Sequence, residues 1–244
     1  MTVIITLLCK DGIILASDTQ STIPSMAMKR RNNSKIHEIN KKTILASAGD
    51  VPFIHRLEEQ IDETIKKGEI ANDINARQLR DFFCMQVHGI RCEYLQQFNK
   101  LGNLDNAPFA VFILCSHDGT HQAYLITADG IYERIDGYEA IGSSKSYAEV
   151  ILMNQYDPNI TVEDGKQLAY WAIRQCCELD PFVGLPIKIM TLQNNTCEMV
   201  PENETKAMES SYSMRKMLFK ELNKSGEDVL KILDAIKDSK SDGE

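Results

Sequence analysis

The chain has 244 residues, of which 43% are hydrophobic, and a formal net charge of −8. This length accommodates one large domain or two small ones, and the apolar fraction is ample for a core. The acidic balance argues against nucleic acid as a main partner, because phosphate backbones are bound by basic patches. No stretch approaches 18 consecutive apolar residues, so the sequence predicts no membrane span.

The first third of the chain is predicted to contain strands followed by helices. Four β-rich runs come first, at residues 3–9, 13–18, 35–39 and 43–48. Asp11-Gly12 joins the first two runs, and Asp-Gly is a strong hairpin signal because the turn needs positive φ. Asp50 then suits the N-cap of an amphipathic helix that ends near Gly68, and a longer helix is predicted over residues 75–99.

The rest of the first 200 residues repeats the order of strands and then helices. Runs separated by Asp-Gly turns predict a meander over residues 107–115, 122–127, 130–134 and 138–141. One helix is expected from Ser143 or Ser144 to about Tyr156, and Thr161 heads another. A hairpin over residues 187–193 and 196–200 closes the core. This order predicts an α+β fold with two antiparallel sheets, each covered by a pair of helices.

Pro201 marks the predicted boundary between a domain over residues 1–200 and a helical C-terminal extension over residues 201–244. The extension is polar to about Ser211 and helical afterwards. Residues 225–228 resemble a capping box and precede an apolar stripe. That stripe packs either on its own domain or on a neighbouring subunit, and the sequence leaves both open. The charged end, residues 237–244, is expected to be disordered.

Cysteines and histidines are placed without a ligand pattern. The seven cysteines are odd in number, include no CxxC pair and lie mostly in apolar runs, which favours reduced thiols in a cytoplasmic protein over a disulfide framework. The opening run lacks a basic leader, so no signal peptide is predicted. His117 and His121 flank a hairpin turn, but nothing in their spacing supports a metal site, and no cofactor is predicted.

Thr2 is the candidate nucleophile. If Met1 is removed, Thr2 carries a free α-amine whose ordinary pKa of about 7.7–8 makes it a base at neutral pH. A threonine hydroxyl paired with its own amine is a known nucleophile–base arrangement. It needs a cation and a carboxylate, which Lys35 and Asp18 supply if three strands bring them together, and a backbone donor, for which Gly49 is suitable. Spacing alone leaves the ordinary interpretation open, in which Thr2 simply begins an edge strand.

The whole N-terminal stretch resembles a proteasome β-type subunit of the N-terminal-nucleophile hydrolases. The matching segments are Thr2, residues 12–18, 35–39, 48–50, 141–144 and 180–184, in the family's order and at about its separations. The resemblance covers roughly residues 2–200. It implies a four-layer αββα sandwich with Thr2 as nucleophile, Asp18 and Lys35 as its charge partners and Gly49 as oxyanion donor. It also implies that Ser143 and Asp180 assist around the α-amine.

Two departures from the family pattern stand out. The family commonly has a serine three residues after the helper aspartate, where this chain has Val183, so one hydrogen bond is missing or supplied otherwise. The loop between Asp18 and Lys35 is one residue longer than usual. Both departures, and the lack of a visible propeptide beyond Met1, resemble the smaller bacterial and archaeal homologues of the HslV and Anbu type.

Three functions follow from this resemblance. The first is a threonine-type endopeptidase that acts on polypeptides within a homo-oligomeric ring or double ring, with a possible unfolding ATPase as partner. The second is a proteasome-related transpeptidase or protein ligase, in which an amine captures the acyl ester. The third is a non-catalytic structural ring subunit. The presence of Thr2, Asp18 and Lys35, with no extra helix before Thr2, favours the first.

Overall fold

Two five-stranded antiparallel sheets form the centre of the first part of the chain. The computed structural model describes residues 2–23, 28–30, 34–68 and 74–222. The chain divides into two compact units, Met1–Val200 and Pro201–Glu244.

The first sheet has the strand order β10-β1-β2-β11-β12. Its strands are β1 (Val3–Cys9), β2 (Gly12–Asp18), β10 (Tyr138–Gly142), β11 (Ile187–Gln193) and β12 (Thr196–Met199). Every neighbouring pair is antiparallel. All seven residues of β2 are buried, which explains why this strand is a continuous apolar run in the sequence instead of an alternating one.

The second sheet has the order β5-β6-β7-β8-β9. Its strands are β5 (Ile36–Asn40), β6 (Thr43–Gly49), β7 (Ala110–His117), β8 (His121–Ile126) and β9 (Tyr132–Arg134). A short helical turn, η2 (Leu104–Asn106), precedes β7. The facing sides of the two sheets share an apolar cluster that includes Ile4, Ile13, Ile44, Ile113 and Ile141.

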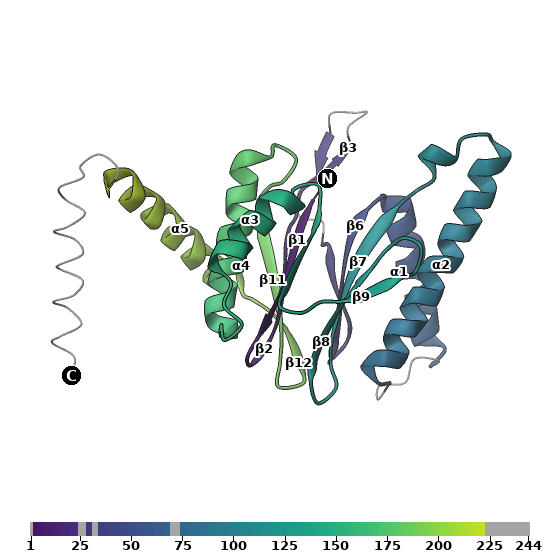
Figure 1. The fold of residues 1–244 in the computed structure, drawn as a ribbon, viewed down its shortest axis with the longest axis horizontal. Helices are drawn as coiled ribbons and strands as arrows, with labels where there is room; N and C mark the ends of the chain where they lie inside the picture. Colours follow the sequence, from purple (N-terminus) through teal and green to yellow (C-terminus); the bar gives the residue numbers. More distant parts are fainter. Residues whose placement is uncertain (1, 24–27, 31–33, 69–73, 223–244) are drawn as a thin grey trace. The chain divides into compact units, whose positions relative to one another are not determined.

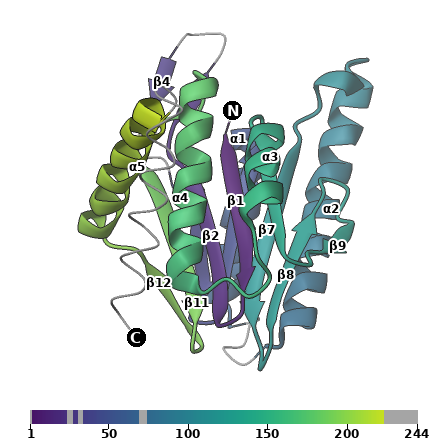
Figure 2. The ribbon, with the colours of Figure 1, turned by 60° about the vertical axis from the view of Figure 1, so that its left-hand side comes forward.

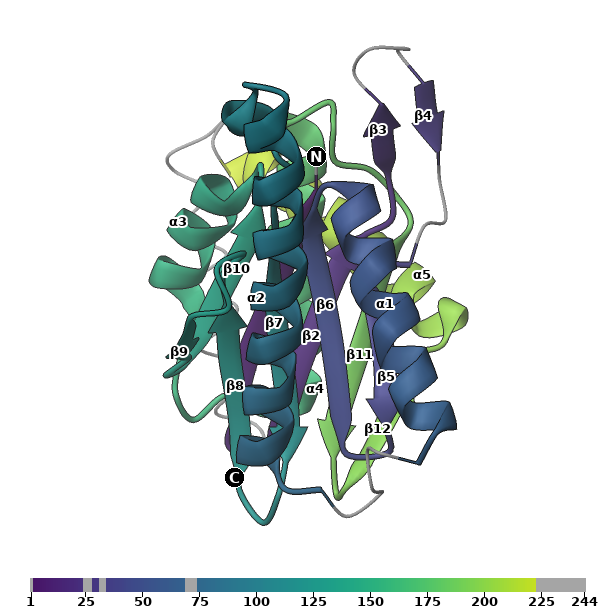
Figure 3. The same ribbon diagram turned by 90° about the vertical axis from the view of Figure 1, so that its right-hand side faces the viewer.

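Helices cover the outer face of each sheet, so the first unit is an αββα sandwich (Figure 1). Helices α3 (Lys145–Gln155) and α4 (Val162–Leu179) cover the sheet that contains β1 and β2 (Figure 2). Helices α1 (Val51–Lys66) and α2 (Ala76–Lys100) cover the second sheet (Figure 3). Phe53, Leu57 and Ile61 recur every four residues on α1, and this spacing places one apolar face against the sheet.

Most of the predicted elements are confirmed, with small shifts of their ends. The meander prediction was wrong for its last strand, because β10 leaves the second sheet and pairs with β1 through Val3↔Gly142 and Ile4↔Ile141. Asp50 and Ser144 occupy the N-cap positions of α1 and α3, but neither side chain makes a capping hydrogen bond. Asp50 Oδ2 instead accepts from the Phe109 N–H at 2.8 Å.

Two further differences concern segments that the sequence patterns left undefined. The loop after Asp18 contains a short hairpin, β3 (Ser21–Ile23) with β4 (Met28–Arg30), which was not predicted. In the second unit, α5 spans Glu202–Leu222 and therefore begins well before Ser211. The predicted capping box at 225–228, its apolar stripe and the predicted disordered end at 237–244 lie outside the described residues.

Candidate active site

Thr2 lies immediately before β1 and is 6% exposed. Its N–H donates to Ser143 Oγ at 3.2 Å, and its carbonyl accepts from that hydroxyl at 3.3 Å and from the Ser144 N–H at 3.4 Å. In the full-length chain this nitrogen is a peptide amide, and it becomes an α-amine only when residue 1 is removed. The contact with Ser143 therefore shows where the α-amine of a processed chain would lie.

Gly142, the last residue of β10, makes room for Thr2. Its φ is +103°, a conformation that L side chains rarely adopt. A Cβ at this position would lie 2.2 Å from the Thr2 carbonyl oxygen and 2.7 Å from Thr2 Cγ2. The glycine is therefore required for the backbone of β10 to approach the candidate nucleophile.

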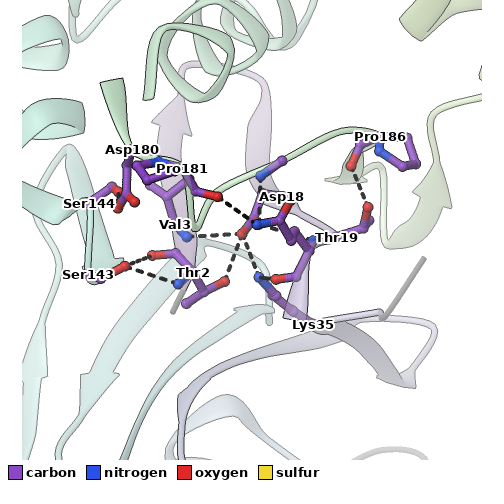
Figure 4. A network of polar contacts seen from close by, with 12 residues as sticks. Thr2, Val3, Asp18, Thr19, Lys35, Ser143, Ser144, Asp180, Pro181 and Pro186 are labelled. Carbon is purple, nitrogen blue, oxygen red and sulfur yellow. Dashed lines mark hydrogen bonds and ion pairs between the residues drawn. The ribbon is translucent and has the colours of Figure 1, made fainter. Parts of the chain in front are cut away.

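Asp18, the last residue of β2, organises the site (Figure 4). Its side chain is fully buried. Oδ1 accepts from the Thr2 hydroxyl at 2.8 Å, the Val3 N–H at 3.0 Å and Lys35 Nζ at 2.6 Å. Oδ2 accepts from the Gln20 N–H at 3.1 Å and the Gly184 N–H at 3.3 Å. Every contact is from a donor, as a buried carboxylate requires.

Lys35 directly precedes β5 and crosses from the second sheet to the end of the first. It is 7% exposed, and its Nζ binds both Asp18 Oδ1 and the Gln20 carbonyl, the latter at 2.8 Å. Burial lowers the pKa of the Lys35 ammonium below its ordinary value, and the Asp18 carboxylate with its hydrogen bond offsets part of that effect. The lysine thus shares an acceptor atom with the Thr2 hydroxyl.

Gly49 ends β6 and presents its N–H toward the side of β5. The Ser47 N–H donates to the Lys35 carbonyl at 3.1 Å, and backbone N–H groups two residues apart point the same way along a strand. The register of β6 with β7 agrees, because the Asp50 N–H donates to Phe109 on the opposite side. The Gly49 N–H therefore points to the same side as β5, but it lies past the Ser47–Lys35 hydrogen bond and pairs with no residue of that strand. Its φ of +143° and its close contact with Phe109 leave no room for a side chain.

Asp180, the residue after α4, does not contact Thr2 through any hydrogen bond of the described residues. Its Oδ2 accepts from the Ser144 hydroxyl, and its Oδ1 accepts from the Phe182 N–H at 2.8 Å. Ser144 in turn donates its N–H to the Thr2 carbonyl. Ser143 is thus in direct contact with Thr2, whereas Asp180 is linked to Thr2 through Ser144.

Sequence reasoning missed two residues that hold Asp18 in place, Gln20 and Gly184, and one that holds the Thr2 carbonyl, Ser144. Gln20 donates its N–H to Asp18, offers its carbonyl to Lys35 and donates from Nε2 to the Pro181 carbonyl at 3.0 Å. Gly184 binds Asp18 from the loop after α4, and Ser144 links that loop to Thr2. Because two of these contacts use backbone atoms, no side-chain pattern in the sequence could have identified them. The pairing of β2 with β11, in which Asp18 lies opposite Ile187, brings the loop before β11 to Asp18, and only the structure shows that pairing.

A cavity of about 1010 Å³ opens beside Thr2. Lys35, Gly49 and Ser143 also line it, so four of the predicted site residues share one cavity, and Ser47 lines it as well. Among the described residues, no cluster of three or more histidines, cysteines and carboxylates is arranged to hold a metal. Helices long and apolar enough to cross a membrane are likewise absent from the described ranges.

An αββα sandwich with a buried hydroxyl residue, a carboxylate and a lysine at the start of its first strand defines the class of N-terminal-nucleophile hydrolase folds. Within that class, the family model described as proteasome subunit matches residues 2–192, and the chain belongs to this family. The match includes every strand of the two five-stranded sheets except β12, and it ends one residue before the end of β11.

Three relatives illustrate the similarity. Proteasome subunit beta 2 of Pyrococcus furiosus is 28% identical over 191 residues, which cover 76% of this chain and 84% of the relative. Proteasome subunit beta 1 of Thermococcus onnurineus is 26% identical over 205 residues, covering 83% and 93%. Proteasome subunit alpha of Methanocaldococcus jannaschii is 26% identical over 208 residues, covering 82% and 73%.

Proposed function

We propose that this protein is a threonine-type endopeptidase of the proteasome family, with Thr2 as its nucleophile once residue 1 has been removed. The observation that carries the proposal is the convergence of the Thr2 hydroxyl and Lys35 Nζ on a single oxygen of the buried Asp18, at the wall of a cavity large enough for a peptide side chain. Membership in the proteasome subunit family and the beta subunits among its relatives support a peptidase.

In this mechanism the Thr2 α-amine accepts the proton of the Thr2 hydroxyl as Oγ1 attacks the carbonyl carbon of a peptide bond. The tetrahedral intermediate collapses to an acyl ester on Oγ1, and the amine passes its proton to the departing peptide nitrogen. Water then attacks the ester and loses a proton to the α-amine. The amine returns this proton to Oγ1 as the bond between Oγ1 and the acyl carbon breaks, which releases the carboxyl product and regenerates the Thr2 hydroxyl. Lys35, held by Asp18, supplies positive charge next to Oγ1 throughout. Ser143 Oγ orients the amine.

The Gly49 N–H is the proposed oxyanion donor. It lies at the end of β6 on the side of β5, beyond the last hydrogen bond of that strand pair, and Gly49 lines the same cavity as Thr2. A donor fixed by the sheet costs no reorganisation when charge develops on the carbonyl oxygen. Asp180 acts as a positioning residue, because its bond to Ser144 orders the backbone that holds the Thr2 carbonyl.

We also propose that the protein works as a subunit of a homo-oligomeric ring or double ring in the cytoplasm, with polypeptides as substrates and an unfolding ATPase as a candidate partner. Family membership supports the ring. Enclosure would separate an unregulated nucleophile from other cellular proteins. Analytical ultracentrifugation of the purified protein tests this part, since a monomer at micromolar concentration would contradict it.

The catalytic proposal is tested by three versions of residue 2. Intact mass establishes whether Met1 is absent. Thr2→Val keeps the shape of the side chain and should abolish peptide hydrolysis, whereas Thr2→Ser keeps a hydroxyl and should retain a measurable part of it. A peptide with an electrophilic carbon should add its mass to the Thr2 peptide of the natural chain and leave Thr2→Val unlabelled. Unchanged turnover in Thr2→Val would remove the proposal.

Hydrolysis and transpeptidation share the acyl ester and differ in what captures it. Incubation with a substrate peptide and an excess of a second peptide amine separates the two by mass, because hydrolysis yields only the shortened peptide while ligation adds the mass of the amine. We expect hydrolysis to dominate. A ligated product as the main species would assign the chain to transfer chemistry with the same nucleophile.

A further inference from the structure

Residues of α1 and β5 form part of the wall of the cavity beside Thr2. His37 on β5 and Glu58 on α1 line it, and His37 Nε2 lies 3.0 Å from Glu58 Oε1. Both side chains are about one-third exposed, so the pair is open to a molecule that enters the cavity. Neither residue contributes to the proposed nucleophile, and neither was identified from the sequence.

The lysines and the carboxylates of the cavity wall do not neutralise one another. Two lysines, Lys35 and Lys145, line it, but each is paired with carboxylates outside the lining: Asp18 for the first, Glu139 and Glu149 for the second. The wall's own carboxylates are Asp50 and Glu58. Within the described residues, neither carboxylate forms an ion pair with a lysine or arginine. The lysine charges of the wall are thus balanced by carboxylates outside it, whereas the carboxylates of Asp50 and Glu58 give the cavity an excess of negative charge.

Glu58 lines the same cavity as Thr2, and the geometry of the chain from Lys35 to His37 indicates how far apart the two lie. His37 follows Lys35 by two residues, so in an extended chain their side chains point to the same face and lie about 7 Å apart. Lys35 Nζ shares Asp18 Oδ1 with the Thr2 hydroxyl, so a residue whose carbonyl meets Thr2 starts next to Lys35. A lysine or arginine side chain spans about this distance. Ser47, which is small, lines the cavity beside them, and Val51, Ile54 and Val111 add apolar wall for the methylene stem.

We propose that this cavity selects peptides with a lysine or arginine on the amino side of the cleaved bond, and that Glu58, held by His37, is the group that recognises the positive charge. The inference rests on the proposed peptidase function and names its substrate class. The apolar wall alone would favour leucine or phenylalanine. The carboxylate decides against them, because a partly desolvated charge pair is stronger than the contact of a few additional methyl groups.

The test uses three fluorogenic peptides that differ only in the residue before the reporter: arginine, leucine or glutamate. Initial rates are measured at pH 8, where ordinary imidazoles are uncharged. For the natural chain, kcat/KM should be highest for arginine and at least 100-fold higher than for glutamate. Glu58→Gln should lower the value for arginine about tenfold or more and change the value for leucine less than threefold.

Glu59→Gln is the matched control. Glu59 is the next residue of α1, is exposed, and does not line the cavity, yet its substitution changes the net charge by the same amount. It should leave all three rates within twofold. Preserved cleavage of the leucine peptide by Glu58→Gln shows that this variant is folded and that its nucleophile works.

The outcomes separate the two proposals. Arginine preference that is lost in Glu58→Gln supports the inference. Thr2-dependent cleavage that favours leucine or glutamate, or an arginine preference that survives in Glu58→Gln, overturns the inference and leaves the peptidase intact. Cleavage that is unchanged in Thr2→Val, or no cleavage of any of the three peptides by a chain lacking Met1, overturns the proposed function, and the inference with it.

Discussion

Asp18→Asn is the most informative single substitution in this site. It keeps the size of the side chain and removes one negative charge from a fully buried position. The carboxylate accepts three hydrogen bonds at Oδ1 and two at Oδ2, all from donors. An asparagine can present its oxygen to only one of these sets, so its NH₂ group must face the donors of the other.

The cost follows from the burial of the partner charge. Lys35 is 7% exposed and has no other carboxylate among its described ion pairs, so the substitution leaves its ammonium in the protein without a counter-charge. Breaking a buried pair in this way costs roughly 3–5 kcal/mol. This is a large part of the roughly 5–15 kcal/mol that stabilises a typical domain. Asp18→Asn with Lys35→Met removes the uncompensated charge and should recover at least about 1 kcal/mol.

The deficit should also shrink as pH rises. Burial already lowers the pKa of Lys35 in the folded protein, and the Asp18 carboxylate opposes this, so its removal lowers that pKa further. Between the folded pKa and the unfolded value of about 10.4, the unfolded chain binds more protons than the folded one, and stability therefore rises with pH. This rise in stability begins at lower pH in Asp18→Asn than in the natural chain. The difference in the free energy of unfolding between the two proteins therefore becomes smaller as pH rises.

Urea unfolding at pH 7, 8 and 9, at one protein concentration, measures both effects. The fixed concentration is needed because assembly adds to apparent stability. The reasoning would be refuted by an Asp18→Asn deficit below about 1 kcal/mol at pH 7, or by a deficit that grows toward pH 9. A double variant less stable than Asp18→Asn would show that the loss does not come from the unpaired ammonium.

Three further substitutions test the surroundings of the site. Gly142→Ala places a Cβ 2.2 Å from the Thr2 carbonyl at positive φ, so we expect a loss of at least about 1–3 kcal/mol in urea unfolding, whereas Gly89→Ala, with open space around it in α2, should gain about 0.5–1 kcal/mol. Gln20→Met removes the donor to the Pro181 carbonyl and should cost about 1–3 kcal/mol, with kcat falling more than KM rises; equal stability would contradict this. Lys35→Arg keeps the charge but not the shape, and kcat should fall about 100-fold with KM within threefold, as measured by initial rates; a smaller fall would mean that charge alone suffices.

The fold was largely predictable because its strands and helices have distinct patterns. Asp11-Gly12 between two apolar runs indicated the hairpin of β1 with β2, and the spacing of Phe53, Leu57 and Ile61 indicated α1. The position of β10 was not predictable, because a short strand after an Asp-Gly turn pairs as well with the preceding strand as with a distant one. Only the three-dimensional arrangement brings it to β1, where Gly142 meets Thr2.

The site was less accessible to sequence reasoning. Lys35 reaches Asp18 across 17 positions of the chain, and the Thr2–Ser143 contact spans 141. Such contacts depend on how strands from two sheets end at the same edge, which no local pattern encodes. The resemblance to a family provided the residues, and the structure adds what that resemblance could not: the backbone donors on Asp18 and the acidic wall of the cavity.

Val183 illustrates how the site compensates for a departure from the family pattern. This residue is 3% exposed, so a hydroxyl in its place would need a buried partner, and its N–H donates to the Asp180 carbonyl. The same turn directs the next N–H, that of Gly184, to Asp18 Oδ2, and the Gln20 side chain ties the turn to β2 through Pro181. A Cβ on Gly184 would lie 2.4 Å from Gln20 Oε1, so a side chain at this position would displace the end of the Gln20 side chain. Backbone and amide contacts thus hold the loop against Asp18 here, and the Gln20 side chain contributes the amide contact.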